Sequence, residues 1–378
     1  MLDVPEKVDI STWLPFGEQL RVLLSGDRIS IGDLATLARK KGLFASGLDR
    51  TRLIQFLSTT LVQPVEIEKL LKDSVSREAK PKAQPQKVTL TATDARWQAA
   101  VERLQVDFAT VAGIERIPGV SFVREPSIQR VDRNHLVVSY EISREDYSRD
   151  LLHRELSFTA DISIRQDEGA WVLDVISTYT AKETDRINDQ IINHVTRELK
   201  VAGISKDDTP AKIRLGSFDG NNHVTFLLRL AGPSTVGKEP GQIVDLTIKP
   251  NSARAGADLP PELKLLEGSI RNMRMDGDKL NEISLLANVQ YHGSFLMTRV
   301  LVDHPFDFEG VKGKCSVVYY FQIARGSEDL AIAPFSFGVE SISITGVRKS
   351  EQQPKARKAL NAAILAAVDR HFTALRSL

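Results

Sequence analysis

The sequence lacks the residues and segments by which many proteins are classified at once. Cys315 is the single cysteine among 378 residues, which excludes an internal disulfide and a metal site built from cysteines. No apolar run approaches the roughly 18 residues needed to cross a bilayer. The first residues, MLDVPEKVDISTW, carry early acids and no apolar segment, so we expect no signal peptide and a cytoplasmic protein.

An excess of charge of one sign is also missing. The chain has 50 Lys and Arg residues against 49 Asp and Glu residues, a formal net charge of +1. Such a balance excludes a protein that coats nucleic acid or membrane with its whole surface, so any such binding must come from a local patch. Aromatic residues make up only 6% of the chain, and those in the body, such as Phe158 and Trp171, fall at strand periodicity. We therefore expect them in the core rather than on a base-stacking surface.

The one phosphate-loop pattern in the chain is incomplete. GPSTVGKE, residues 232–239, nearly follows G-x-x-x-x-G-K-[ST], but Glu239 stands where a hydroxyl must hold magnesium. Pro240 and Gly241 follow, so the helix that this motif requires cannot continue well. We therefore expect an ordinary turn between two strands, not a nucleotide site.

Other catalytic patterns are equally weak. Asp245 followed by Glu262 and Lys264 imitates the acid…acid-x-Lys spacing of a nuclease, but Pro260 and Pro261 oppose the strand that this motif needs. The chain has no G-x-S-x-G turn for a catalytic serine. Its histidines form no His-x-x-x-His or His-x-His pair; they lie at positions 135, 153, 194, 223, 292, 304 and 371. The sequence therefore predicts no catalytic residue, no cofactor and no metal ligand.

Composition divides the chain near residue 90. Residues 73–90 are rich in Lys, Pro, Gln and Ser and poor in large apolar residues, which predicts a flexible linker. Residues 1–72 show helical periodicity, whereas the residues after the linker alternate between apolar and polar, as half-buried strands do. We therefore predict an α+β protein with a small helical N-terminal module, a linker and a large antiparallel-sheet body with helices.

Within the body, residues 91–203 form the first predicted α+β unit. LSFTADISI, residues 156–164, alternates cleanly and is typical of a strand with one buried face. The strands of this unit precede a segment in which apolar residues recur every four positions from Ile187 to Leu199. That spacing predicts a helix packed on the sheet through one stripe.

Residues 262–378 form a second predicted α+β unit with the same order of strands followed by a helix. LNEISLLANVQY, residues 280–291, is predicted as its first strand and KCSVVYYFQI, residues 314–323, as a later one. Between the units, residues 204–261 are predicted to carry a hairpin around DGNN, residues 219–222, and a connecting segment. Residue identity between the units is slight, so a true duplication and a single continuous body both stay open.

The stretch LARKKGLFASGLDRTRLIQFL, residues 37–57, is the most informative part of the sequence. A Ser-x-x-Asp pattern at residues 30–33 predicts a helix that starts near Ile31. Basic residues close that helix, where cations favour the C-terminal dipole, and Gly42 suits the left-handed position after it. Asp49 is placed to cap a second helix.

The spacing in this stretch matches a known pattern. The matching residues are Leu34, Leu37, Arg39, Lys40, Lys41, Gly42, Leu43, Ser46, Gly47, Leu53, Ile54 and Leu57. They resemble the SAP and related helix-extended-helix families, in which an apolar helix ends in basic residues before Gly-Leu, Ser-Gly and a second helix. The resemblance covers about 30 of 378 residues. It departs from the family pattern because five residues rather than four separate Gly47 from Leu53, and because arginines replace the usual lysine before the second helix.

The resemblance implies binding of duplex DNA, or of RNA, through helix N-termini and basic side chains. The candidate phosphate contacts are Arg39, Lys40, Lys41, Arg50 and Arg52. Lys and Arg neutralise phosphates and release counterions without reading bases, and all five residues could share one face. Two other roles for these basic residues stay open. They could have a purely structural role, because the helix dipole alone favours cations at this position, or they could dock a protein.

Three functions follow from these observations. The first is a non-enzymatic adaptor or scaffold that contacts nucleic acid through its N-terminal module, while the body docks a protein partner or self-associates. The second is a binder of lipid or another apolar ligand, because amphipathic strands followed by a helix are similar to tubular lipid-binding (TULIP-like) domains. The third is a hydrolase or nuclease whose site assembles only in three dimensions. We expect the first.

Overall fold

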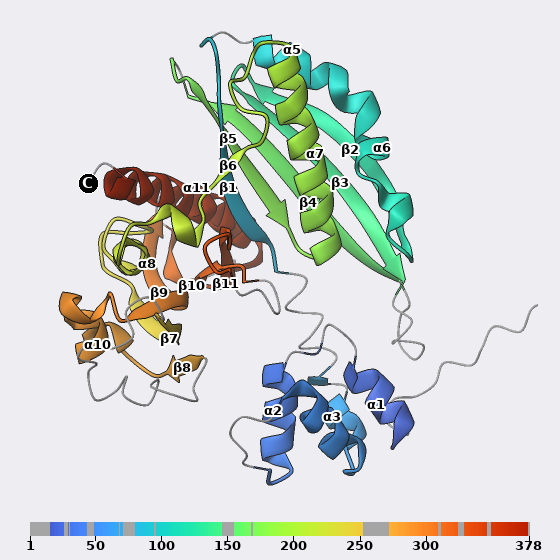
Figure 1. Cartoon of the computed structure of the whole chain (residues 1–378), viewed down its shortest axis with the longest axis vertical. Helices are drawn as coiled ribbons and strands as arrows, with labels where there is room; N and C mark the ends of the chain where they lie inside the picture. The colour runs from blue at the N-terminus through green and yellow to red at the C-terminus, as the bar shows by residue number, and fades with distance from the viewer. Residues whose placement is uncertain are drawn as a thin grey trace, which may run out of the picture.

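The computed structural model describes residues 16–25, 29, 31–43, 49–67, 69–70, 80–93, 96–145, 155–167, 169–251, 272–308, 311–323, 329–345 and 349–376. These residues form a helical N-terminal domain and a body built on one antiparallel sheet of 11 strands (Figure 1). The predicted α+β class is therefore confirmed. Among the helices of the described ranges, none has the length and apolar character needed to span a membrane.

The N-terminal domain starts its helices where the sequence predicts. Its helices are α1 (Glu18–Ser25), α2 (Ile31–Lys40) and α3 (Arg50–Ser58), followed by helical residues at 64–67 and 69–70. Gly42 follows α2 with a φ of 83°, the left-handed conformation that glycine adopts without a Cβ penalty. Asp49 caps α3, because its Oδ1 accepts a hydrogen bond from the Arg52 amide at 2.8 Å. Leu34 and Leu57 are fully buried in the shared core.

The sheet of the body runs in the order β2-β3-β4-β5-β1-β11-β10-β9-β7-β8, and β6 pairs with β1. The strands are β1 (Lys82–Thr89), β2 (Val120–Asp132), β3 (His135–Glu145), β4 (Glu155–Gln166), β5 (Val172–Tyr179), β6 (Ala211–Lys212), β7 (Gln242–Pro250), β8 (Met273–Asp276), β9 (Phe295–Phe308), β10 (Val311–Phe321) and β11 (Phe335–Ile344). All of their pairings are antiparallel, as the apolar and polar alternation predicts.

Two long helices cover opposite faces of this sheet (Figure 1). Val88 of β1 and Val175 of β5 belong to the core beneath α7. The next residue along β1, Lys87, forms ion pairs with Asp174 of β5 and with Asp369 of α11. Because successive side chains of a strand point to opposite faces, α11 lies on the face away from α7. The body helices are α5 (Arg96–Arg103), α6 (Phe108–Val111), α7 (Lys182–Val201), α8 (Asn222–Ala231), α10 (Ser284–Ala287) and α11 (Lys349–Arg376), with 3-10 turns at Leu104–Asp107, Ile114–Arg116, Leu215–Ser217, Leu280–Glu282 and Val289–Tyr291.

The body repeats one order of elements twice. The first run is β1, α5 with α6, β2, β3, β4, β5 and α7; the second is β6, α8, β7, β9, β10, β11 and α11, with β8 as an added edge strand. The last strand of each run bonds to its first segment: β5 pairs with β1, and the Phe335 amide of β11 donates to the Ile213 carbonyl beside β6 at 2.7 Å. The two runs meet where β1 pairs with both β6 and β11. This repeated order of elements favours a duplicated α+β unit over a single continuous body.

The predicted linker is wrong over its C-terminal half. Lys82–Thr89 is not a linker but strand β1, which pairs along its whole length with β5. Its alternate residues Gln84, Gln86, Val88 and the following Leu90 are buried on one face, and Ala83 is buried on the other. The polar composition of this segment predicts a linker although it is a central strand, because two of the inward-facing side chains of the strand are glutamines. Residues 73–79 of the predicted linker lie outside the described part of the chain.

Residues 204–251 are likewise not a hairpin and a connector, and residues 252–261 of that predicted segment lie outside the described part of the chain. DGNN leads into helix α8, because the apolar residues that follow it also recur at helical spacing and pack on one side: Val224, Phe226, Leu227 and Leu230. Strand β6, helix α8 and strand β7 are the front of the second unit. The strand predicted at residues 280–291 is instead three short helical turns. Trp171 lies just before β5 and is 53% exposed, so its predicted place in the core is also wrong.

Candidate functional site

Two of the five predicted phosphate contacts are occupied by partners within the N-terminal domain. Lys41 Nζ lies 2.5 Å from Glu66 Oε2, and the exposed fractions of the two side chains are only 16% and 18%. Burial raises the pKa of Glu66, but hydrogen bonds from Lys41 and from the Gln63 amide outweigh it and lower that pKa overall. Lys41 therefore ties the end of α2 to the last helical turn of the domain.

Arg50 joins the start of α3 to the end of α1 and to the residues before α2. Its guanidinium donates hydrogen bonds to the carbonyl groups of Leu24 and Ser25 at 3.3 and 3.2 Å, and also to that of Ile29. Leu24 and Ser25 are the last residues of α1, whose final carbonyls have no partner inside the helix. The planar fork of five N–H groups suits this role, which a lysine could not reproduce.

The remaining three predicted contacts are exposed. Arg39 and Lys40 lie at the end of α2, and among the described residues Arg39 bonds only to groups of its own helix, the Ala35 carbonyl and the Thr36 hydroxyl. Arg52 lies in the first turn of α3, with its side chain 71% exposed and 3.9 Å from Asp49. An exposed ion pair of this length is weak, so the Arg52 guanidinium stays accessible to another anion.

These three cations do not form one cluster. Arg50 bonds the carbonyl of Ile29, so α3 starts beside the residues that precede α2. Arg39 and Lys40 lie at the far end of that helix, whose 10 residues span about 15 Å. The expected single basic face is therefore two separate cationic positions, Arg52 at one end of α2 and Arg39 with Lys40 at the other. The connector between them, residues 44–48, lies outside the described residues.

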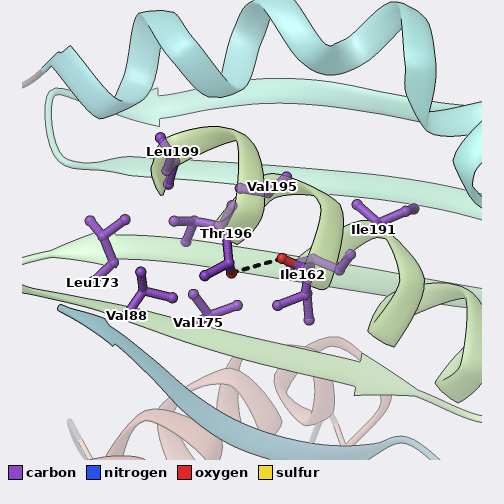
Figure 2. A pocket seen from close by; sticks show the side chains of 10 residues that line it. Val88, Ile162, Leu173, Val175, Ile191, Val195, Thr196 and Leu199 are labelled. Atoms are coloured by element: carbon purple, nitrogen blue, oxygen red, sulfur yellow. Dashed lines mark hydrogen bonds between the residues drawn. The ribbon is translucent and has the colours of Figure 1, made fainter. Parts of the chain in front are cut away.

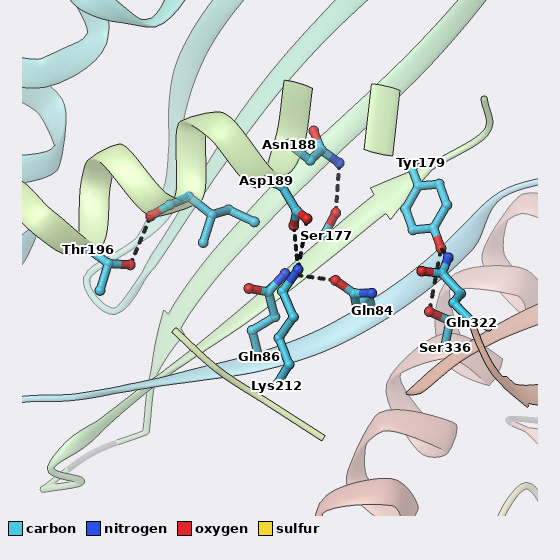
Figure 3. A network of polar contacts seen from close by, with 11 residues as sticks. Gln84, Gln86, Ser177, Tyr179, Asn188, Asp189, Thr196, Lys212, Gln322 and Ser336 are labelled. Atoms are coloured by element: carbon cyan, nitrogen blue, oxygen red, sulfur yellow. Dashed lines mark hydrogen bonds and ion pairs between the residues drawn. The ribbon is translucent and has the colours of Figure 1, made fainter. Parts of the chain in front are cut away.

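A second polar site, which the sequence does not predict, lies where the two units of the body meet (Figure 3). We call it the polar seam, and its side chains are Gln84, Gln86, Ser177, Tyr179, Asp185, Asn188, Asp189, Lys212, Gln322 and Ser336. They come from β1, β5, α7, β6, the residue after β10 and β11. Six of them are at most 2% exposed: Gln84, Gln86, Ser177, Tyr179, Asn188 and Ser336. Buried polar groups of this kind destabilise a fold unless they are hydrogen-bonded.

Lys212 joins the two units through the centre of the seam. Its Nζ lies 2.7 and 2.8 Å from the two carboxylate oxygens of Asp189, so a strand of the second unit is paired with the helix of the first. Beside this pair, Gln86 Nε2 donates to Gln84 Oε1 at 3.1 Å. Gln86 Oε1 is buried and has no hydrogen-bond partner in the described structure.

Asn188 links α7 to the sheet below it. Its Nδ2 donates to Ser177 Oγ at 2.9 Å and to the Thr178 carbonyl at 3.1 Å. Its Oδ1 accepts a hydrogen bond from the Tyr140 hydroxyl at 2.7 Å. Burial raises the pKa of Tyr140 well above its ordinary value, so this hydroxyl keeps its proton and acts as a donor. Every polar group of Asn188 is thus used, which fixes the position of the helix over the sheet.

Tyr179 connects the polar seam of the first unit to side chains of the second unit. The Gln322 amide donates to its hydroxyl, and Ser336 Oγ lies 3.4 Å away. Tyr179 belongs to β5, whereas Gln322 follows β10 and Ser336 lies on β11. The three side chains therefore connect strands that are distant in sequence, on the face of the sheet that α7 covers (Figure 3).

Asp185 is the one carboxyl of the seam with a strongly displaced pKa. Burial, with a smaller contribution from the neighbouring Asp189, raises the pKa of Asp185 to about 6, and Lys212, Lys82 and Gln322 only partly offset this. Its Oδ1 is buried without a hydrogen-bond partner among the described residues. Asp185 therefore exchanges its proton close to neutral pH, within a network that joins the two units.

The space beneath α7 is too small for an apolar ligand. Side chains of β1, β4, β5 and α7 enclose a cavity of about 10 Å³ there (Figure 2). Its lining is almost entirely aliphatic, with Thr196 as the exception, and the Thr196 hydroxyl donates to the Ile192 carbonyl at 2.8 Å. A cavity of this volume corresponds to about one water molecule. In the described ranges, no group of three or more His, Cys, Asp or Glu side chains is arranged to hold a metal ion.

Comparison with known proteins adds information mainly about the N-terminal domain. Residues 18–80 match a family described as the GAPS4b protein N-terminal domain. The match ends two residues before β1 begins at Lys82. No curated protein matches the chain.

A solved structure, that of DynU16, a protein in the dynemicin biosynthetic locus, also matches. The identity is 10%, the match covers 76% of this chain and 98% of that chain, and the TM-score is 0.20. A similarity at this level carries no argument about fold or function. The SAP-like resemblance of the N-terminal domain stays a prediction.

Proposed function

We propose that this protein is a non-enzymatic adaptor that binds nucleic acid through its N-terminal helical domain. The observation that carries the proposal is the division of the five basic residues into two kinds. Lys41 and Arg50 hold the domain together, whereas Arg39, Lys40 and Arg52 are exposed and make no strong ion pair in the described structure. The exposed cations are not needed to stabilise the fold, which leaves them to bind an external anion.

The spacing of the exposed cations suits a polyanion better than a small anion. Arg52 lies on the helix that starts beside the residues before α2, whereas Arg39 and Lys40 lie at the end of α2, and a helix of 10 residues spans about 15 Å. A duplex carries one phosphate charge per about 1.7 Å of its axis, so two positions at this distance meet different phosphates of one molecule. Such contacts position the domain on the backbone without reading the sequence.

The body has a separate part in this proposal. It places a large α+β unit at the nucleic acid, where it docks a protein partner or self-associates. No ligand-sized space lies beneath α7, and the polar seam uses most of its groups to join the two units. The proposal places the protein in the cytoplasm, where nucleic acid is accessible to it.

The proposal is tested by fluorescence anisotropy with a labelled 20-base-pair duplex and the full-length chain. The test variant carries Arg39→Gln, Lys40→Gln and Arg52→Gln. The matched control carries Arg116→Gln, Lys279→Gln and Lys312→Gln, three body cations whose side chains are 77%, 59% and 71% exposed. Both variants lose the same net charge, so a difference between them reports the location of the binding surface.

We expect the first variant to bind the duplex at least about tenfold more weakly than the control, because three phosphate contacts are removed. Equal affinities of the two variants would show that the N-terminal cations are not the binding surface. Absence of binding by the unaltered chain to duplex DNA and to RNA at low salt would overturn the proposal as a whole.

A further inference from the structure

Two arginines at one edge of the sheet share a single buried carboxylate. The carboxylate is that of Asp245 on β7, and the arginines are Arg274 on β8, the last strand of the sheet, and Arg299 on β9 (Figure 1). Arg274 Nε donates to Asp245 Oδ2 at 3.0 Å, and Arg274 Nη2 donates to the same oxygen. Arg299 Nη1 lies 2.9 Å from Asp245 Oδ1. Two guanidinium groups are therefore held beside one carboxylate, although one would be enough to neutralise it.

The register of the strands places both arginines on one face of the sheet. Thr247 pairs with Arg274 on one side and with Arg299 on the other, so the two arginine Cα atoms lie about 10 Å apart, two strand spacings. Leu246 belongs to the core, so its neighbours Asp245 and Thr247 point to the opposite face. The side chain of Asp245 is only 3% exposed, whereas those of Arg274 and Arg299 are 63% and 33% exposed. The two guanidinium groups therefore face the solvent from fixed positions.

Most of the hydrogen-bond donors of this pair are not used within the described structure. A guanidinium carries five N–H groups, and Arg274 gives two of them to Asp245, which leaves three. Asp245 Oδ1 accepts no hydrogen bond from the described residues although Arg299 is close, so the N–H groups of Arg299 do not point at it. No other acceptor among the described residues bonds either guanidinium. Two sets of charged donors thus remain for an external acceptor.

We propose that Arg274 and Arg299 bind a phosphate group at this edge of the body. Arginine forks match phosphate oxygens, and such charge-assisted hydrogen bonds are about twice as strong as neutral ones. The carboxylate of Asp245 already lies between the two forks. A tetrahedral anion can offer oxygens to both forks from above this carboxylate, which a second planar carboxylate does less well. This site lies outside the N-terminal domain and does not rest on the function proposed for that domain.

The same geometry argues against a metal ion at Asp245. This residue is the first acid of the spacing that imitates a nuclease, and the other two residues of that spacing lie outside the described part of the chain. Each oxygen of Asp245 has a guanidinium group beside it. A divalent cation bound there would meet two positive charges at short range. The role of Asp245 is therefore to position the two arginines.

The test follows the Nε–H resonances of the full-length chain, labelled with ¹⁵N arginine, during titration with inorganic phosphate at constant ionic strength. We expect saturable shifts of Arg274 and Arg299, and weaker binding of acetate. Arg274→Gln and Arg299→Gln should each weaken phosphate binding at least about tenfold, because a charged donor pair is lost. Each variant leaves Asp245 one arginine, so the buried carboxylate stays paired. The matched control is Arg165→Gln, which removes an arginine that is also 63% exposed and lies 3.1 Å from Asp167; it should leave the affinity unchanged.

Asp276→Asn gives a readout that a purely structural arginine pair would not move. Asp276 is exposed, lies opposite Asp245 in the register of β7 and β8, and its charge acts on Arg274. Removal of this negative charge should strengthen phosphate binding by about two- to fivefold, as the loss of one exposed charge does. An unchanged or lower affinity would show that phosphate does not bind beside Arg274.

A labelled 20-base-pair duplex distinguishes the two sources of the phosphate group. If the site takes a nucleic-acid backbone, Arg274→Gln and Arg299→Gln should weaken duplex binding as well as phosphate binding. If it takes a free phosphate or a phosphate monoester, both variants should bind the duplex as the unaltered chain does. Absence of saturable phosphate shifts at the two arginines, or equal affinities for phosphate and acetate, would overturn the proposal. Neither result would affect the test of the N-terminal cations, which uses other variants.

Discussion

Lys41 and Glu66 form an ion pair of 2.5 Å that is largely shielded from water, although Lys41 and its exposed neighbour Lys40 are adjacent in a run of basic residues. Lys41→Ala should lower the free energy of unfolding of the N-terminal domain by about 1–3 kcal/mol, because a part-buried carboxylate loses a charged hydrogen-bond partner. Lys40→Ala should change it by less than about 0.5 kcal/mol, as an exposed substitution does. Urea unfolding of the two variants measures this difference, and equal losses would contradict the assignment of Lys41 to the fold.

The second prediction concerns β1, the first strand of the body, and whether the body folds without it. A fragment that begins at residue 80 retains β1, whereas one that begins at residue 91 removes the strand that bridges the two units. We expect the longer fragment to unfold cooperatively and the shorter one to be unfolded or aggregated, because β5, β6 and β11 would lose their common partner. Circular dichroism and thermal unfolding compare the two fragments. A folded, cooperative fragment 91–378 would show that β1 is dispensable.

Sequence patterns predicted the elements in which one face is apolar and the other polar. Strand β4 and helices α7 and α11 have such a stripe, and all three appear where expected. Strand β1 could not be predicted in this way, because Gln84 and Gln86 occupy the inward positions that apolar residues normally take. Sequence patterns also predict a strand where α8 lies, because a short apolar run satisfies both the strand and the helix periodicity.

The candidate site, too, is predictable from the sequence only in part, because its contacts join residues that are distant along the chain. Sequence spacing marks basic residues near helix ends, but it does not show which of them find an internal partner. Arg50 contacts the carbonyl groups of Leu24, Ser25 and Ile29, which are more than 20 positions away. The polar seam likewise joins residues from both units of the body, such as Asp189 and Lys212. No local sequence motif predicts these tertiary contacts.

Acidification should destabilise the body through two buried histidines. Burial lowers the pKa of His223 and of His304 to about 4, whereas an unfolded histidine titrates near its ordinary value of 6.5. Their contribution is fully present above pH 6.5 and is lost as the pH falls from 6.5 to about 4, because only the unfolded state takes up protons there. Each contributes a slope of up to about 1.4 kcal/mol per pH unit. Urea unfolding at a series of pH values should show His304→Gln flattening this slope, and an unchanged slope would contradict the account.

Asp185 should have the opposite dependence. Burial raises the pKa of Asp185 to about 6, so the folded state loses stability as the pH rises from 3.8 through 6. Asp185→Asn should therefore raise the midpoint of thermal unfolding at pH 7.5 and have little effect at pH 4. Asp189→Asn is the matched control on the same helix, and it should lower the midpoint because it weakens the pair with Lys212. Destabilisation by both substitutions at pH 7.5 would contradict the assignment of the displaced carboxyl to Asp185.

The salt dependence of duplex binding tests the central claim most directly. The logarithm of the affinity falls with the logarithm of salt concentration by about 0.9 for each phosphate contact, so the slope counts contacts. The account predicts that Arg39→Gln, Lys40→Gln and Arg52→Gln each reduce the slope by about 0.9, while Lys279→Gln leaves it unchanged. Full-length protein that binds without salt dependence, or with a slope that none of the three substitutions alters, would contradict it.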